Sequence, residues 1–435
     1  MKLKELKQII LKGGDKKTMK TKIKQEKGIT LIALVVTIVV LLILAGVSLN
    51  ALFGNSGIIE KAKEAQNKMD KATENDQKQI GELTNWLDNQ VNGTTGSDDN
   101  QTKLPKISTL VGTVVDKNTK AEDAYGNKIT IPKGFKILKH GTAAGSATYT
   151  YSGDNIPAVQ DGIVIENKTD GNQFVWVPVG TIKNKDNTTS TITLGRYSDF
   201  TAKNGVYTPA QVASVENCTQ EVTIDTYFKE LSTFREGNSA TDSTAQNATA
   251  RDLKTFIETS LANGGYYIAR FEASGTASKI TSKYNQTVFG DITQPNAAKA
   301  AREMYGEVKE NNELVYASDL VNSYAWDTTI IFIQTYSTET DASSYASKNK
   351  STSFSKTGIN NDKYCNIWDM SGNTCEWTTE YSTVFGNGMV DLHGCRGGFY
   401  ISGADEDELY TSNRVDEFQC APPRIRGLRP LLYVK

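Results

Sequence analysis

Residues 367–378 read IWDMSGNTCEWT, and the fold and one candidate site are inferred outward from this stretch. Asp369, Asn373 and Glu376 place three oxygen-bearing side chains around Gly372, a residue type that permits a sharp turn. Hard oxygen ligands on a tight loop suit Ca²⁺. Oxygen-rich loops also form ordinary turns in which the same groups only hydrogen-bond to the loop. The stretch therefore predicts either a calcium loop or a hydrogen-bonded turn.

Short apolar and aromatic runs alternate with turn residues from about residue 106 onward. Runs of this kind, bounded by Gly, Asn and Asp, predict strands, and residues 431–434 predict a closing strand. Two insertions rich in Asn, Ser and Thr, 181–248 and 336–362, are predicted to lie outside the core. The other predicted strands are 129–132, 163–165, 174–179 and 266–271, and the predicted helices are 250–261, 297–305 and 319–335. The mixture predicts an α+β, loop-rich domain.

Five segments, taken in their order, resemble the formylglycine-generating enzymes (sulfatase-modifying factors), a branch of the C-type lectin-like fold. They are FVWVP at 174–178, GYYIARFE at 265–272, the stretch 367–378, RGG at 396–398 and GLRP at 427–430. The resemblance covers roughly residues 131–435 and implies a C-type lectin-like domain.

The same resemblance implies a set of calcium ligands. Asp369 and Glu376 would bind through their side chains, and Gly372 and Thr374 through their backbone carbonyls. The arginines of the two glycine-containing segments are expected to pair with buried carboxylates such as Glu376 or Glu272.

The number and positions of the cysteines and histidines argue against the metal-dependent oxidation that enzymes of this family catalyse. Its oxidases hold copper with two closely spaced cysteines between the RGG and GLRP segments, because thiolate pairs suit Cu(I). Here Cys420 is the single cysteine within residues 399–426, and Cys395 precedes the RGG segment. The chain has two histidines, too few for the iron site of the related ergothioneine-type oxidases. We therefore expect neither copper nor catalytic residues. A divergent oxidoreductase that uses Cys395 and Cys420 is the alternative.

The cysteines have other uses. Cys365, Cys375 and Cys395 lie near the core segments and are expected to be buried thiols. A disulfide between Cys395 and Cys420 is a further possibility for an exported domain.

The N-terminal region predicts a membrane anchor. Residues 29–49 carry no charge, and as a helix they would be roughly 32 Å long, the thickness of a bilayer's hydrocarbon core. The preceding 28 residues hold ten lysines and three acids, which should keep them cytoplasmic. The sequence thus predicts a single-pass protein of the cell membrane, with its C-terminal domain outside the cell.

The junction KGITLI, residues 27–32, resembles the leader of type IV prepilins. The resemblance implies cleavage after Gly28 by a prepilin peptidase and N-methylation of Ile29. Ala33 stands where the family usually has glutamate, so assembly with other pilin-like subunits is in doubt. The predicted division is a leader (1–28), a transmembrane and amphipathic helix (29–91), a linker (92–105), a short β lead-in (106–130) and the enzyme-like domain (131–435).

The stretch 399–426 is the candidate ligand-binding surface. It mixes aromatic anchors with adaptable polar groups, a composition favoured in paratopes. The candidate residues are Phe399, Tyr400, Tyr410, Asn413, Arg414, Asp416, Phe418 and Arg424. Its position before the C-terminal GLRP resembles the variable region of proteins diversified by retroelements. An ordinary surface loop is the alternative.

A net charge of −2, from 48 basic and 50 acidic residues, gives no reason to expect nucleic-acid binding. The leading hypothesis is a pilin-like, membrane-tethered surface protein whose lectin-like domain binds an unknown extracellular ligand without catalysis. The alternatives are the divergent oxidoreductase and a minor structural pilin.

Overall fold

The structure is a computed structural model in which the described residues all lie in the second of two compact units, 101–435. The predicted leader and membrane span lie outside the described residues, and no helix within the described part is long and apolar enough to cross a bilayer. The described residues are 103–138, 158–198, 200, 207–216, 222–223, 228–230, 248–337, 353–360, 362–384, 390–398, 410–418 and 425–435.

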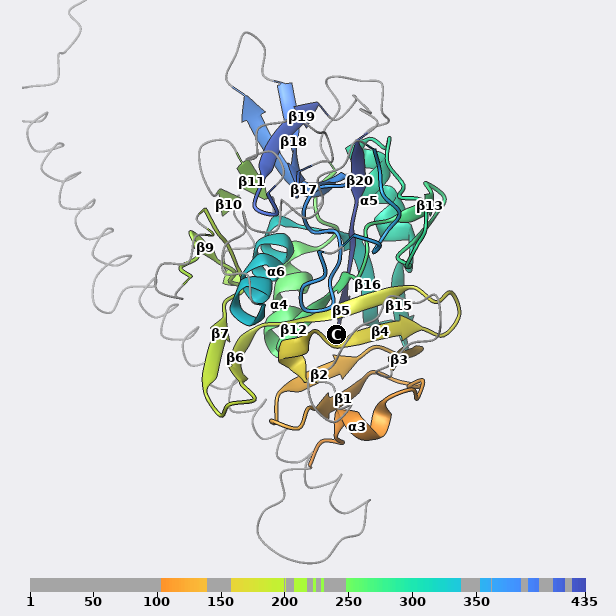
Figure 1. The fold of residues 1–435 in the computed structure, drawn as a ribbon, viewed down its shortest axis with the longest axis vertical. Helices are drawn as coiled ribbons and strands as arrows, with labels where there is room; N and C mark the ends of the chain where they lie inside the picture. The colour runs from red at the N-terminus through yellow and green to blue at the C-terminus, as the bar shows by residue number, and fades with distance from the viewer. Residues whose placement is uncertain are drawn as a thin grey trace, which may run out of the picture. The chain divides into compact units, whose positions relative to one another are not determined.

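A seven-stranded antiparallel sheet forms the centre of this unit (Figure 1). Its order is β15-β16-β21-β12-β5-β4-β3, so the C-terminal strand is held between two neighbours. The strands are β3 (Phe135–Ile137), β4 (Val164–Asn167), β5 (Gln173–Pro178), β12 (Gly265–Ala269), β15 (Glu307–Glu310), β16 (Glu313–Leu320) and β21 (Pro430–Val434). The predicted strands at 163–165, 174–179, 266–271 and 431–434 are confirmed, with shifts of one or two residues at their ends.

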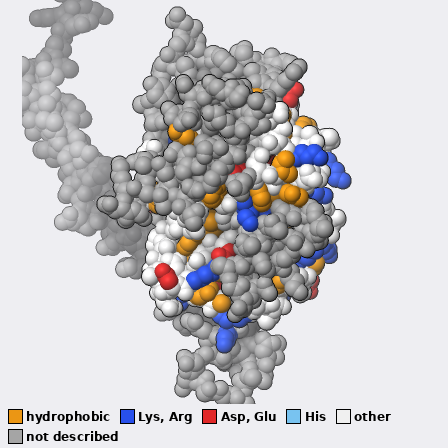
Figure 2. Space-filling model, viewed as in Figure 1, with side chains coloured by type: hydrophobic (Ala, Val, Ile, Leu, Met, Phe, Trp, Pro, Cys, Tyr) orange, Lys and Arg blue, Asp and Glu red, His pale blue; other side chains and the backbone are white. Residues whose placement is uncertain are grey.

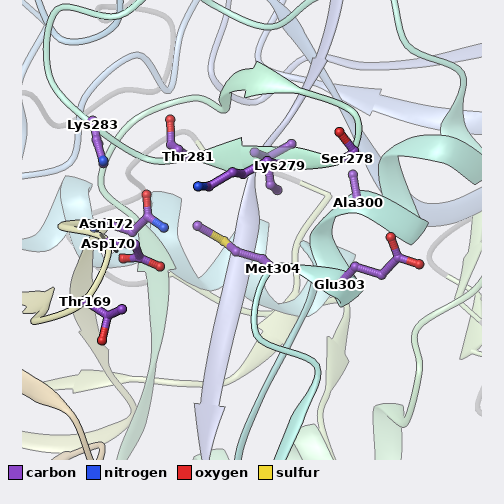
Figure 3. Close-up of a pocket in the computed structure, with 11 residues that line it drawn as sticks. Thr169, Asp170, Asn172, Ser278, Lys279, Thr281, Lys283, Ala300, Glu303 and Met304 are labelled. Atoms are coloured by element: carbon purple, nitrogen blue, oxygen red, sulfur yellow. Dashed lines mark hydrogen bonds between the residues drawn. The ribbon is translucent and has the colours of Figure 1, made fainter.

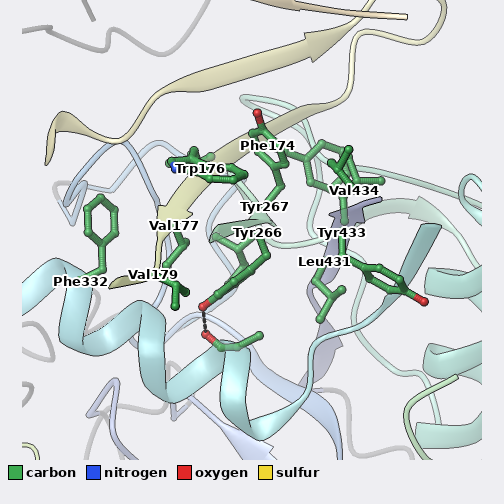
Figure 4. Close-up of a cluster of buried hydrophobic side chains, with 14 of the residues drawn as sticks. Phe174, Trp176, Val177, Val179, Tyr266, Tyr267, Phe332, Leu431, Tyr433 and Val434 are labelled. Carbon is green, nitrogen blue, oxygen red and sulfur yellow. Dashed lines mark hydrogen bonds between the residues drawn. The ribbon is translucent and has the colours of Figure 1, made fainter. Parts of the chain in front are cut away.

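Both faces of the central strands are buried, which explains their continuous apolar runs. Tyr266 of β12 points to one face, where its hydroxyl contacts Ala325 O at 2.5 Å and Thr329 Oγ1 at 3.0 Å in helix α6 (Figure 4). Tyr267 points to the other face, where its ring packs on Trp176 and its hydroxyl donates to Thr130 O at 3.0 Å. At β12, helix α6 (Ser323–Tyr336) therefore packs on one face of the sheet and strand β2 (Lys128–Ile131) on the other.

Three longer helices surround the sheet, and side-chain caps set two of their starts. They are α4 (Leu253–Asn263), α5 (Gln294–Glu303) and α6 (Ser323–Tyr336). The side chain of Asp252 accepts from Thr255 N at 2.9 Å, and that of Asn322 accepts from Ala325 N at 2.9 Å. The predicted helix 319–335 therefore started too early, because Asp319 and Leu320 end strand β16. The helices predicted at 250–261 and 297–305 are confirmed with shifted ends.

A second sheet contains the end of the stretch 367–378, because its strand β17 begins at Cys375. Its path is β10-β11-β17-β18-β19, and β20 pairs in parallel with β17. Its strands are β10 (Val222–Thr223), β11 (Phe228–Glu230), β17 (Cys375–Val384), β18 (Val390–Arg396), β19 (Arg414–Phe418) and β20 (Arg426–Leu428).

The remaining elements are short. They are helix α3 (Ile107–Leu110), the 3₁₀ helix η1 (Val159–Asp161), and four two-stranded sheets: β1 (Thr119–Glu122) with β2 (Lys128–Ile131), β6 (Gly180–Lys183) with β7 (Thr189–Ile192), β8 (Gly195–Arg196) with β9 (Gln211–Val212), and β13 (Ser274–Thr276) with β14 (Lys279–Thr281). The predicted strand 129–132 is confirmed as β2.

The prediction that residues 181–248 lie outside the core is wrong for its first part. Ile192, Leu194 and Tyr197 are at most 1% exposed and belong to the main hydrophobic core. These side chains are apolar although the insertion as a whole is polar, so average composition concealed them.

We predict unequal costs for two glycine substitutions that share one backbone conformation. Gly112 and Gly162 both have φ of +77°, but a Cβ at Gly112 would meet nothing within 4 Å, whereas one at Gly162 would lie 1.8 Å from the backbone oxygen of Cys365. Gly112→Ala should lower the free energy of unfolding by about 1 kcal/mol through the left-handed conformation alone. Gly162→Ala should cost at least about 3 kcal/mol, since backbone must also move. Equal urea midpoints for the two variants would contradict this.

Candidate functional site

The stretch 367–378 forms a buried turn that leads into β17. Asp369, Gly372 and Asn373 have φ values of 57°, 67° and 59°, so the chain turns through three left-handed positions. The amide of Asn373 donates to the carboxylate of Glu272, and Thr374 donates to Glu272 Oε1 from its backbone N at 2.9 Å and from its hydroxyl at 2.6 Å. Glu272, on the chain just after β12, therefore fixes the turn against the main sheet.

Arg429 pairs with Glu376 in the interior, as predicted. Its Nε and Nη2 lie 3.1 and 2.7 Å from Glu376 Oε1, and both side chains are fully buried. The same guanidinium donates to the backbone oxygens of Asp369 at 2.7 Å and Ala269 at 3.1 Å. One arginine thus joins the turn, β17 and β12.

Calcium at this turn stays a prediction. Among the described residues, no group of three or more His, Cys, Asp or Glu side chains is placed to hold a metal ion. Of the predicted ligands, Glu376 accepts from Arg429, and Asp369 accepts from Gly358 N at 2.7 Å through its side chain. The guanidinium of Arg429, which binds the backbone oxygen of Asp369 and the carboxylate of Glu376, places a positive charge beside these two predicted calcium ligands.

Burial shifts the acids around the turn toward their protonated forms. The pKa of Glu272 lies well above its ordinary value of 4.5, because burial and the neighbouring Asp369 and Glu376 disfavour its charge. Burial likewise raises the pKa of Asp362 well above its ordinary value and that of Glu376 to about 8, while Arg429 opposes the shift at Glu376.

A second buried charge cluster, which we call the arginine cluster, joins the second sheet to helix α6 and strand β8. It contains Arg196, Arg396 and Arg414 with the carboxylates of Asp327 and Glu380. Arg396 and Arg414 bind the two oxygens of Asp327 at 2.5 and 2.9 Å, and Arg414 Nε lies 3.1 Å from Glu380 Oε2. Arg196 also binds Glu380. The arginine side chains hold the pKa of Glu380 below its ordinary value against the opposing effect of burial.

The predicted partner of Arg396 is corrected by this cluster. Arg396 pairs with Asp327 and, at 3.7 Å, with Glu380, and not with Glu376 or Glu272. Asp327 and Glu380 were not identified from the sequence as the carboxylate partners of buried arginines. The available signal was a single acid within the otherwise uncharged helical run YAWDTTIIFI, where an ionised group needs a partner.

The candidate ligand-binding residues divide into described and undescribed ones. Phe399, Tyr400 and Arg424 lie outside the described residues, and only the backbone of Asp416 and Phe418 is described, in β19. Tyr410, Asn413 and Arg414 are partly buried. The side chain of Arg414 is 12% exposed and serves the arginine cluster, so it supports the frame from inside.

The described thiols are buried or partly buried, as expected. Cys375 and Cys395 are at most 1% exposed, and Cys365 is partly buried. Cys395 Sγ lies 3.5 Å from Arg426 Nη1. Cys420 lies outside the described residues, so the proposed disulfide stays a prediction.

Comparison with known proteins finds only distant structural similarity. No protein-family model and no curated protein matches the chain. Similar solved structures include the Major Tropism Determinant P3c variant, at 13% identity and a TM-score of 0.26, and the U1 variant, at 12% identity and 0.24; each match covers 77% of this chain and 100% of the other. Likenesses of this size decide neither fold nor function.

We predict that the arginine cluster is sensitive to loss of one carboxylate. Asp327→Asn removes the charged partner that the fully buried Arg396 shares with Arg414 and should lower the free energy of unfolding by about 3–5 kcal/mol. Glu258→Gln, which removes a carboxylate that is 44% exposed on α4, is the control and should change it by less than about 0.5 kcal/mol. A denaturant titration that finds the two variants alike would contradict the role given to Asp327.

A second prediction concerns pH. Burial raises the pKa of Glu230 from 4.5 to about 7, while Ser323 and Thr379 donate hydrogen bonds to its carboxyl group. Between these values the folded chain keeps a proton that the unfolded chain releases, so this group's stabilising contribution falls as pH rises from 4.5 toward 7. Its slope is at most about 1.4 kcal/mol per pH unit.

Glu230→Gln should flatten the decline in unfolding free energy between pH 5 and 7, with Glu258→Gln as the charge-removing control. Chemical denaturation at several pH values measures this. An unchanged slope in Glu230→Gln would show that Glu230 is already ionised in the folded protein.

Proposed function

We propose that the chain is an exported, membrane-anchored surface protein whose C-type lectin-like domain binds an extracellular ligand without catalysis. The N-terminal sequence supports the anchor: the uncharged residues 29–49 follow a lysine-rich leader that resembles a prepilin signal. The described domain is sheet-rich with few helices.

The observation that carries the binding proposal is the way the arginine cluster fixes both ends of one long connection. Strand β18 ends at Arg396 and β19 begins at Arg414, and these two residues are direct partners in the sheet. Both bind Asp327 of α6. The intervening candidate ligand-binding residues therefore start and finish at a fixed base, and changes among them need not disturb the core.

The environment of Cys395 argues against the oxidoreductase alternative. Redox-active cysteines typically lie in partly exposed, electropositive surroundings, whereas Cys395 is 0% exposed. Arg426 brings a positive charge to its sulfur, yet burial denies a peptide substrate access to it. The minor-pilin alternative depends on the N-terminal helix and keeps the same prediction of leader cleavage.

The proposal is tested by expressing the full chain with and without a prepilin peptidase. We expect cleavage after Gly28, methylation of Ile29, retention in the membrane fraction, and digestion of the C-terminal domain by protease added to intact cells. Gly28→Leu should block cleavage. The purified protein should hold no copper and should not oxidise a cysteine-containing peptide.

Two results would reject the proposal. Recovery of an uncut, soluble product from the cytosol would remove the display function, and turnover of the cysteine peptide would favour the oxidoreductase. Recovery of the mature chain only in sheared filaments would favour the minor pilin.

A further inference from the structure

A polar pocket of about 400 Å³ lies next to the β13–β14 hairpin (Figure 3). The turn before β5, the hairpin with the residues that follow it, and the end of α5 form its walls. Its lining residues are Thr169, Asp170, Asn172, Ser278, Lys279, Ile280, Thr281, Lys283, Ala300, Glu303 and Met304. The volume suits one or two sugar-sized units.

Hydrogen bonds hold one wall of the pocket in place. Asp170 Oδ1 accepts from the hydroxyl of Tyr305 at 3.1 Å and from Asn172 N at 2.9 Å. Asn172 is 2% exposed, and its Oδ1 accepts from Ser282 N at 2.9 Å. The ring of Tyr305 packs edge-on against Phe135. The polar groups of this wall are therefore positioned before any ligand arrives.

The pocket has charges that the described residues do not neutralise. Lys279 is exposed and Lys283 partly buried, and neither forms an ion pair with a described carboxylate. Both ammonium groups point toward the side of the pocket that holds Asp170 and Asn172 (Figure 3). Lys and Arg side chains also gather on the molecular face around β13 (Figure 2). The second acid of the lining, Glu303, lies across the pocket from Lys283 and Asp170 in Figure 3 and is 3.9 Å from Lys299. The two ammonium groups and Asp170 therefore leave a local positive excess at the other end of the pocket.

We propose that this pocket binds a small acidic saccharide of the uronate type. The ammonium groups of Lys279 and Lys283 take the ligand's carboxylate. Asp170 Oδ2, which has no partner among the described residues, accepts a sugar hydroxyl, and the hydroxyls of Ser278 and Thr281 supply further donors and acceptors. Met304 lies between the two sides and offers an apolar contact for the C–H face of the sugar ring (Figure 3). None of the candidate ligand-binding residues at 399–426 is among the residues that line this pocket.

Titration of the full-length protein with glucuronate, followed by saturation-transfer NMR and calorimetry, tests the inference. We expect a dissociation constant of roughly millimolar, typical of a ligand this small. Glucose should bind at least about tenfold more weakly, because it lacks the carboxylate. The double substitution Lys279→Gln with Lys283→Gln should weaken glucuronate binding by at least about tenfold.

Lys254→Gln is the matched control, because Lys254 is 52% exposed on α4 and neither it nor its ion-pair partner Glu258 lines the pocket. It should bind glucuronate like the unchanged protein. Absence of glucuronate binding, equal binding of glucose, or equal loss in Lys254→Gln would overturn the inference. So would inorganic phosphate displacing glucuronate at equal concentration, which would show a site for simple anions.

Discussion

The structure depends on the rule that a charge buried in a protein needs a partner. Removal of an ion from water costs several kcal/mol, and only close, well-aligned opposite charges offset it. In this domain Arg196, Arg396 and Arg429 are all fully buried, and each meets a carboxylate. The positions of α6, β17, β18 and β19 are linked through these pairs, so none of them can move without exposing or abandoning a charge.

Strand β17 brings the two buried charge groups together. Near its start Glu376 binds Arg429, which reaches the main sheet, and four residues later Glu380 binds the arginine cluster. An irregularity in the pairing of β17 with β18 lies between these two positions. The strand therefore connects the central sheet to the base of the candidate binding segment. A slip by one residue would turn each strand arginine to the opposite face, away from its carboxylate, so these buried pairs favour a single register.

Sequence reasoning succeeded where a pattern was local. Continuous apolar runs bounded by turn residues located β5 and β12, and GLRP located a buried arginine with its carboxylate partner. It failed where tertiary contacts decided the outcome. Asp319 could belong to a helix by composition, but it ends β16 and binds Arg302 at 2.8 Å. Arg414 has the character of a recognition residue, yet Asp327, 87 positions away, draws it inward.

The buried frame of the domain and the candidate binding segment between β18 and β19 differ in how their side chains are held. Side chains whose partners lie far away in sequence, such as Asp327, hold the frame together; the local sequence can indicate that such a buried charge needs a partner, but it does not say which residue that partner is. The connection between Arg396 and Arg414 has the opposite property, because only its two ends take part in the described charge contacts. The entropy of closing a loop changes slowly with its length. A fixed pair of ends can therefore accept connections of different length and composition at little cost in stability, which is the physical requirement for a binding surface that varies on a constant fold.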